Sequence, residues 1–400
     1  MSLFSAAERF ATIDHSEIVL DGNRCLYSHD QFASCEACFA VCPVSAIQSG
    51  KPPALDSGKC VTCLTCIQTC PVDAYAADDG IQALLTCVAR IETTRIELLC
   101  EKNPFSEQGC ASENIGIRVR GCLAGLGVGA LLALAVLGME SIIIRTDACA
   151  ECAWGMLQAL IDEHVAHTQV LLGAWEKSSI LKSVSYIQET HMRPLWNAQN
   201  PPLSRRDLFR LAARQGQVAL ARSIKQTNPS GIHTPGRDRR RIINAVEHLS
   251  ASKAENDPIL PGSTFATVSV SDSCTACGVC ARACPTGTLH YLPDPEETTF
   301  QLTMSPQFCI GCELCAHICA ANAIVVDHVP SFSQVFGSED ASLLREGDLA
   351  HCEKCKAGYA AVPETHLCPV CSFRHKNPFG SMIPPGIKIP HQGLSGGRQP

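Results

Sequence analysis

Apolar residues between positions 95 and 145 are grouped into short runs that predict the strands of a parallel sheet. The runs at 95–99, 115–119 and 141–145 are mostly apolar, as expected for strands that are covered on both faces. A longer apolar segment at about 128–138 predicts a helix between the second and third strands. The order strand, helix, strand predicts a central parallel α/β domain, which we assign to residues 83–198.

The most apolar part of this domain also has the length of a membrane span. Residues 121–139 contain no charged side chain, and 19 residues are just enough for a transmembrane helix. Four glycines interrupt the segment after Gly121, however, and the β-branched run 142–144 follows almost at once. These features favour a buried helix that leads into a buried strand over a membrane span.

A basic amphipathic segment follows at residues 204–225. Ser204 and Asp207 predict a variant capping box at the start of a helix. One face carries Leu208, Leu211, Val218 and Ala219, and around it stand Arg205, Arg206, Arg210, Arg214 and Arg222. Two interpretations stay open: a solvated linker helix, or a docking surface for an acidic partner or an anionic membrane surface. The sequence SRRDLFR resembles a twin-arginine export signal, but no apolar segment follows it, so we do not expect export.

Two further segments have the composition of connecting chain. Residues 226–263 are rich in Pro, Gly and Ser and include the run Arg-Asp-Arg-Arg-Arg at 237–241, which favours a mobile linker. We therefore assign 199–262 to a basic helix and linker. Residues 377–400 contain several prolines and a Gly-Gly pair and are predicted to form a flexible tail.

Cysteine is the residue whose frequency changes this picture most. The chain has 26 cysteines among 400 residues, many of them three residues apart, a spacing that suits metal sites and is rare in disulfide scaffolds. Residues 1–10 lack the basic and apolar segments of a secretory signal, so we expect reduced thiols in a cytoplasmic protein. The net charge of −7, with 18% charged residues, gives no indication of nucleic-acid binding.

Three cysteine runs resemble those of bacterial-type two-cluster ferredoxins, which have the pattern Cys-x2-Cys-x2-Cys-x3-Cys-Pro. They consist of Cys60, Cys63, Cys66 and Cys70, then Cys274, Cys277, Cys280 and Cys284, then Cys309, Cys312, Cys315 and Cys319. Ala320 replaces the proline after the last run. In that family the fourth cysteine of each run binds the other cluster. The resemblance thus implies one [4Fe–4S] cluster on Cys274, Cys277, Cys280 and Cys319, and another on Cys309, Cys312, Cys315 and Cys284, within a domain at 263–332.

The run that would pair with Cys60–Cys70 departs from the pattern. Phe32 stands where the first cysteine belongs, followed by Cys35, Cys38 and Cys42. The outcome is either a [3Fe–4S] cluster or a fourth thiolate from Cys25, and we favour Cys25. The resemblance then implies a dicluster domain at 1–80. One cluster would use Cys25, Cys35, Cys38 and Cys70, and the other would use Cys60, Cys63, Cys66 and Cys42.

Four cysteines near the C-terminus form two Cys-x2-Cys pairs. Cys352 and Cys355 are separated by twelve residues from Cys368 and Cys371, which suits a tetrahedral site with four thiolates. Zinc in a small ribbon at 345–376 is the favoured interpretation, and rubredoxin-type mononuclear iron is the alternative. Lys356 and Ser372 stand where rubredoxins prefer glycine, which favours zinc.

The central domain has cysteines after its predicted strands: Cys100, Cys122, Cys149 and Cys152. Ligands of open α/β sheets bind at the carboxyl ends of strands. The stretch IRVRGCLAGLGVGALLALAVLGMESIIIRTDACAEC resembles the iron–sulfur delta subunit of methanogen-type hydrogenases that associates with heterodisulfide reductase. This resemblance, over residues 83–175 at most, implies a [2Fe–2S] cluster and an electron relay. The surroundings of Cys100 and Cys110 match poorly, so Cys110 is the substitute ligand, and free buried thiols are the alternative. Cys87 is expected to be structural.

Taken together, the sequence predicts a multidomain α+β and α/β protein with two ferredoxin-like dicluster domains, a central parallel α/β domain and a C-terminal zinc ribbon. We find no dinucleotide-binding motif and no acid–base constellation, and expect no catalysis by the chain alone. The favoured function is an electron relay to a redox enzyme such as a hydrogenase, a formate dehydrogenase or a heterodisulfide-reductase-like complex. Catalysis at the central domain, or a role in iron–sulfur maturation, are the alternatives.

Overall fold

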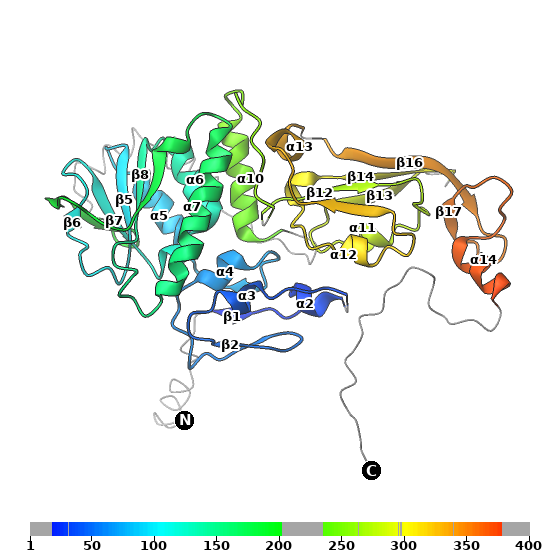
Figure 1. The fold of residues 1–400 in the computed structure, drawn as a ribbon, viewed down its shortest axis with the longest axis horizontal. Coiled ribbons are helices and arrows are strands. Elements are labelled where there is room, and N and C mark those ends of the chain that lie inside the picture. Colours follow the sequence, from blue (N-terminus) through cyan, green and yellow to red (C-terminus); the bar gives the residue numbers. More distant parts are fainter. Residues whose placement is uncertain are drawn as a thin grey trace, which may run out of the picture.

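The computed structural model describes residues 18–201 and 235–377, apart from Gln31, Ser263, Pro295, Glu297 and Glu339. Within this part, the central domain is built on a five-stranded parallel sheet with the strand order β11-β7-β5-β8-β9 (Figure 1). The strands are β5 (Arg95–Cys100), β7 (Ile115–Val119), β8 (Ser141–Arg145), β9 (Leu181–Val184) and β11 (Leu195–Asn197). The three strands predicted from the apolar runs are therefore confirmed, as is their parallel pairing.

Three helices of the central domain pack with this sheet: α5 (Ile81–Val88), α6 (Gly127–Val136) and α7 (Gln158–Gly173). The apolar segment that could have been a membrane span forms α6, where nine of the ten residues are buried. Leu131 and Leu134 belong to the core under the sheet, while Val128 and Leu132 belong to a second core shared with α10 (Arg237–Leu249). No helix in the described residues has the length and apolar character needed to cross a bilayer.

The two cysteine-rich domains share one pattern of strand pairing. In the N-terminal domain, β1 (Val19–Leu20) pairs with β4 (Tyr75–Ala76), and β2 (Ile47–Gln48) pairs with β3 (Ala54–Leu55). In the later domain, β12 (Thr267–Val270) pairs with β15 (Ile324–Asp327), and β13 (Leu289–Pro293) pairs with β14 (Thr299–Met304). All four pairs are antiparallel. Each domain thus joins its first strand to its last and has a hairpin between them.

Short helices lie beside these strands, and each contains a cysteine or begins directly after one. They are α2 (Leu26–His29), α3 (Ala37–Ala40) and α4 (Thr65–Thr69) in the N-terminal domain, and α11 (Val279–Ala283) and α12 (Leu314–His317) in the later one. The sheet of the later domain continues through β16 (Ser342–His351) to β17 (Gly358–Ala360) and ends near α14 (Pro369–Lys376). The C-terminal cysteines are therefore attached to the second cysteine-rich domain through a continuous antiparallel sheet.

The interpretation of residues 226–263 as a mobile linker is wrong for α10. This helix is 13 residues long and buries Ile242, Val246 and Leu249 against α6 and the neighbouring domain. Its arginine-rich first turn is ordered because Arg237 and Arg240 pair with Asp73, and Arg241 pairs with Asp79. The predicted basic helix at 204–225 lies outside the described residues, as do residues 378–400 of the predicted tail.

The ion pairs of α10 lead to a first prediction. We expect Asp79→Ala to lower the free energy of opening of α10 by about 3 kcal/mol, because the change leaves the buried Arg241 without its carboxylate. Native-state hydrogen exchange of the α10 amides would measure this loss. Glu113→Ala is the matched control, since its pair with Arg95 is exposed and should contribute less than about 1 kcal/mol. Equal protection of α10 in the two variants would contradict the assigned role of Asp79.

Candidate iron–sulfur and metal sites

The second cysteine-rich domain gathers its eight predicted ligands into two groups. Burial and the charges of Cys277, Cys274 and Cys319 raise the pKa of the Cys280 thiol to about 12. In the same way, burial and then Cys312, Cys309 and Cys284 raise the pKa of Cys315. Each group thus contains three cysteines of one run and the fourth cysteine of the other run. This is the exchange that the ferredoxin resemblance implies.

The N-terminal domain forms two groups of the same kind. The Cys25 thiol lies close enough to raise the pKa of both Cys35 and Cys38, although burial is the larger cause in each case. Cys35 in turn contributes to the raised pKa of Cys70. The second group surrounds Cys66, whose pKa rises through burial and the charges of Cys63, Cys60 and Cys42. The structure therefore places Cys25 beside Cys35 and Cys38, in the run where Phe32 replaces the first cysteine.

One hydrogen bond recurs at the fourth cysteine of every run. The backbone N–H four residues later donates to the cysteine Sγ, from Ala46 to Cys42 and from Ala74 to Cys70, both at 3.2 Å. The equivalent bonds from Thr288 to Cys284 and from Ala323 to Cys319 are both 3.3 Å long. An N–H donor stabilises a thiolate rather than a thiol. These bonds suit sulfurs that stay ionised as ligands.

The backbone around the cysteines repeats as well. The third residue after each fourth cysteine has a positive φ: Ser45, Asp73, Gly287 and Asn322. Positive φ also occurs twice within each complete run, at Thr62 and Leu64, Ala276 and Gly278, and Gly311 and Glu313. Side chains other than glycine rarely adopt this conformation. The loops are therefore held in a shape that a bound group would stabilise, and thiolates with N–H donors are the ligand set that iron–sulfur clusters require.

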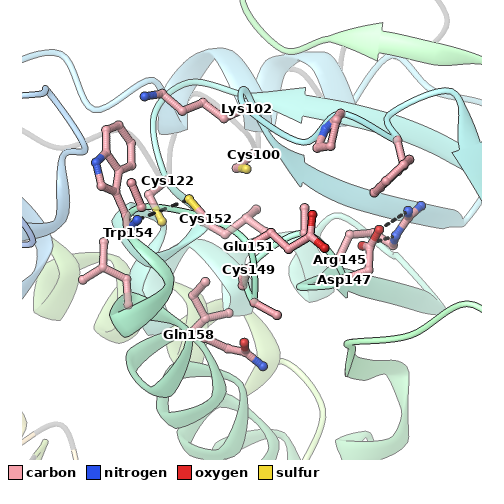
Figure 2. Close-up of a pocket in the computed structure, with 18 of the residues that line it drawn as sticks. Cys100, Lys102, Cys122, Arg145, Asp147, Cys149, Glu151, Cys152, Trp154 and Gln158 are labelled. Carbon is pink, nitrogen blue, oxygen red and sulfur yellow. Dashed lines mark hydrogen bonds and ion pairs between the residues drawn. The ribbon is translucent and has the colours of Figure 1, made fainter.

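The cysteines of the central domain line one cavity of about 410 Å³ at the carboxyl ends of β5, β7 and β8 (Figure 2). Its walls include Cys100, Cys122, Cys149 and Cys152. Burial and neighbouring thiols raise the pKa of Cys122 to about 12 and that of Cys149 to about 11. The backbone N–H of Trp154 donates to Cys152 Sγ at 3.4 Å. Four thiols facing one cavity fit the proposed cluster.

The two other cysteines of the domain lie elsewhere. Cys110 is not among the residues that line the cavity, and its backbone N–H donates to Glu97 Oε1 at 2.7 Å. Cys87 is fully buried in the hydrophobic core, and burial raises its pKa to about 12. The structure thus gathers the favoured four residues and leaves the substitute Cys110 outside, while the position of Cys87 is that of a structural thiol.

A buried charge network beside the cavity was missed by the sequence analysis. Glu97 on β5 accepts hydrogen bonds from Arg145 and Arg193 at 2.9 and 3.1 Å. Arg145 also forms a bidentate pair with Asp147, with both contacts at 2.8 Å. Burial would raise the pKa of Glu97, but Asn114 and Arg193 hold it below its usual value. Arg145 and Asp147 line the cavity, so the network fixes the loop that carries Cys149. The sequence did contain a signal for this network, because Glu97 and Arg145 are charged residues within otherwise apolar strands.

The C-terminal cysteines form the most compact thiol group in the described residues. The four sulfurs of Cys352, Cys355, Cys368 and Cys371 all lie within 4.8 Å of one another. The Sγ atoms of Cys355 and Cys368 are 3.7 Å apart. This distance is close to the roughly 3.8 Å that separates two sulfurs in a tetrahedral site with 2.3 Å metal–sulfur bonds. Burial opposes ionisation of Cys352, but backbone hydrogen bonds outweigh it and lower its pKa to about 6. A single tetrahedral ion fits this arrangement.

Residues 273–323 match the family described as the 4Fe-4S dicluster domain. The chain therefore contains one such domain, and its cysteine clusters are consistent with iron–sulfur electron transfer. Neither the curated proteins nor the solved structures contain a match to the chain.

A second prediction concerns the missing ligand of the N-terminal domain. We expect Cys25→Ser to remove about one iron atom per chain and to create the EPR signal of an oxidised three-iron cluster, because only three thiolates would remain in that group. Cys87→Ser is the matched control and should leave iron content and EPR spectra unchanged. Identical spectra for Cys25→Ser and the unaltered protein would show that Cys25 is no ligand.

A third prediction concerns the C-terminal site. Cys371→Ser should release about one zinc ion per chain without changing the iron content, since this group is separate from the other thiols. Metal analysis of the two proteins prepared side by side measures both values. Loss of one iron atom instead of zinc would assign the site to mononuclear iron, and no loss of metal would refute the site.

Proposed function

We propose that this chain is an electron-transfer protein that holds four [4Fe–4S] clusters in two dicluster domains. A [2Fe–2S] cluster in the central cavity and a zinc ion at the C-terminal cysteines complete the proposed set of groups. Such clusters accept and release single electrons when bound. The observation that carries the proposal is that the cysteine-bearing loops of successive domains pack against one another.

The first of these contacts joins the central domain to the N-terminal one. The backbone N–H of Cys122 donates to the carbonyl oxygen of Cys63 at 3.4 Å. Gly121 and Gly125 permit this approach, because a Cβ atom at either position would lie 3.2 or 3.1 Å from the same oxygen. Two proposed ligands of different groups are thus linked by one hydrogen bond, a short path for an electron.

The second contact joins the N-terminal domain to the later dicluster domain. Leu314, between Cys312 and Cys315, is fully buried in the core of the N-terminal domain, and Ile310 and Cys312 pack against that core. Ile310 also lines a cavity together with Cys70. Consequently the group of Cys284, Cys309, Cys312 and Cys315 faces the N-terminal domain, and the group of Cys274, Cys277, Cys280 and Cys319 lies beyond it.

This order supports a relay with two ends, one at the central cavity and one at the far group of the later dicluster domain. The proposed partners are a donor and a redox enzyme such as a hydrogenase, a formate dehydrogenase or a heterodisulfide-reductase-like complex, in the cytoplasm. The basic segment 204–225 is proposed as a contact with an acidic partner or an anionic membrane surface.

A second candidate function is catalysis at the central domain. The observation that favours it is the polar lining of the cavity beyond its cysteines: Lys102, Glu151 and Gln158 (Figure 2). An enzyme would show turnover without a partner and would lose it in Cys149→Ser while the signals of the dicluster domains survive. A relay would show reversible reduction and no turnover alone.

The relay is tested by anaerobic purification followed by iron, sulfide and zinc analysis, with roughly 16 to 18 iron atoms and about one zinc ion expected per chain. Colourless protein without iron would refute the proposal.

A fourth prediction tests the contact at Cys63. Gly125→Val should slow intramolecular electron transfer between the central and N-terminal domains, because the added side chain pushes the Cys122 loop away from the Cys63 carbonyl. Rapid reduction followed by time-resolved absorbance would measure the rate. Gly173→Ala is the control, since a Cβ atom there meets nothing within 4 Å. Equal rates in both variants, at full iron content, would remove this contact from the path.

A further inference from the structure

Four arginines lie in the first turn and a half of α10, and three of them have carboxylate partners. Arg237 and Arg240 contact Asp73 at 2.9 and 2.8 Å, and Arg241 contacts Asp79 at 2.6 Å. Within the described residues Arg239 forms no such pair, although it is only 8% exposed. A buried guanidinium without a counter-charge is costly. Its position therefore calls for a physical reason.

The surroundings of Arg239 satisfy only part of its side chain. The guanidinium lies over the ring of Phe265, with Cζ 4.0 Å from the ring centroid, which is a cation–π contact. Its Nη1 is buried and has no hydrogen-bond partner in the described part of the chain. The neighbouring carboxylate of Asp238 accepts a hydrogen bond from the backbone N–H of Gly129 at 2.9 Å instead. One donor of Arg239 is thus left for another acceptor.

Sulfur is the acceptor chemistry at this junction, where Cys70 of the N-terminal group and Ile310 of the later dicluster domain line one cavity with Arg239. Arg239 and Ile310 line the same cavity, and Ile310 stands between Cys309 and Cys312. Phe265, whose ring the guanidinium covers, is followed by Ala266, and the Cβ of Ala266 lies 3.4 Å from the position that a Cβ atom of Gly311 would take. The guanidinium is therefore held beside the loop that carries Cys309 and Cys312.

We propose that Arg239 donates its free Nη1–H to a sulfur of the cluster held by Cys284, Cys309, Cys312 and Cys315, and raises the reduction potential of that cluster. This inference rests on the proposed function. One-electron reduction adds a negative charge, and a buried cation stabilises the reduced state more than the oxidised one. Arg239 is not a ligand, and it acts on the cluster only through its charge and its hydrogen bond.

The experiment compares three variants in the full chain by EPR-monitored redox titration. Arg239→Met should lower the potential of one cluster by about 59 mV, a tenfold change in its one-electron equilibrium, and leave the other clusters unchanged. Arg239→Lys should keep most of the potential because it keeps the charge. Arg240→Met, on the same helix, should leave the potential of that cluster unaltered because Arg240 pairs with Asp73.

A potential unchanged in Arg239→Met at full iron content, or shifted equally in Arg240→Met, would overturn the inference while leaving the relay intact. Loss of all iron–sulfur signals from the unaltered protein would refute the relay itself. If Arg239→Met does not fold, the unaltered protein and Arg239→Lys, both labelled with ¹⁵N-arginine, provide the test. Pulsed EPR should show a coupling between an arginine nitrogen and a reduced cluster that is lost in Arg239→Lys, and identical couplings in the two proteins would overturn the inference.

Discussion

The structure depends on the buried ion pairs that α10 makes with the N-terminal domain. Arg237 and Arg240 contact Asp73, three residues after Cys70, so the helix is fixed directly to a loop that carries a proposed ligand. The opposite side of the helix packs on α6, and Arg239 reaches Phe265 at the edge of the later dicluster domain. One helix therefore joins three domains, and in Figure 1 it lies between the central sheet domain and the later dicluster domain.

This junction has an electrostatic consequence for the proposed relay. Asp73 contributes to the raised pKa of Cys70. Arg237 and Arg240 both pair with Asp73, so the negative charge beside the N-terminal group is neutralised. Arg239 attracts the neighbouring Asp238 but forms no ion pair within the described residues, and its charge acts to lower the pKa of Cys309. The groups on the two sides of the junction thus have different charged neighbours. In clusters with equal ligands, hydrogen bonds and local charge set the differences in potential.

The features that sequence could predict are those set by neighbouring residues. The strands of the central sheet follow from apolar runs, and β7 and β8 have the predicted bounds. The exchange of the fourth cysteines is implied by the ferredoxin resemblance, which the cysteine spacing carries. By contrast, α10 depends on contacts with residues more than 160 positions away, and a hydrophilic arginine run in isolation looks like solvated linker. Glu97 was missed for the same reason, since its partner Arg193 is 96 positions away.

The departure at Phe32 coincides with a local change of backbone conformation in the N-terminal domain. At the fifth position of the complete runs, Leu64, Gly278 and Glu313 have φ values of 68°, 64° and 57°. Glu36, at the same position of the altered run, has a φ of −119°. The altered run has no first cysteine, and its backbone at this position does not enter the left-handed region. The turn after Cys42 is retained, with Ser45 at φ 49° and the N–H of Ala46 bound to the Cys42 sulfur. This difference is consistent with the proposed assignment, in which Cys42 belongs to the other group and keeps its turn, while Cys25 supplies the thiolate that the altered loop lacks.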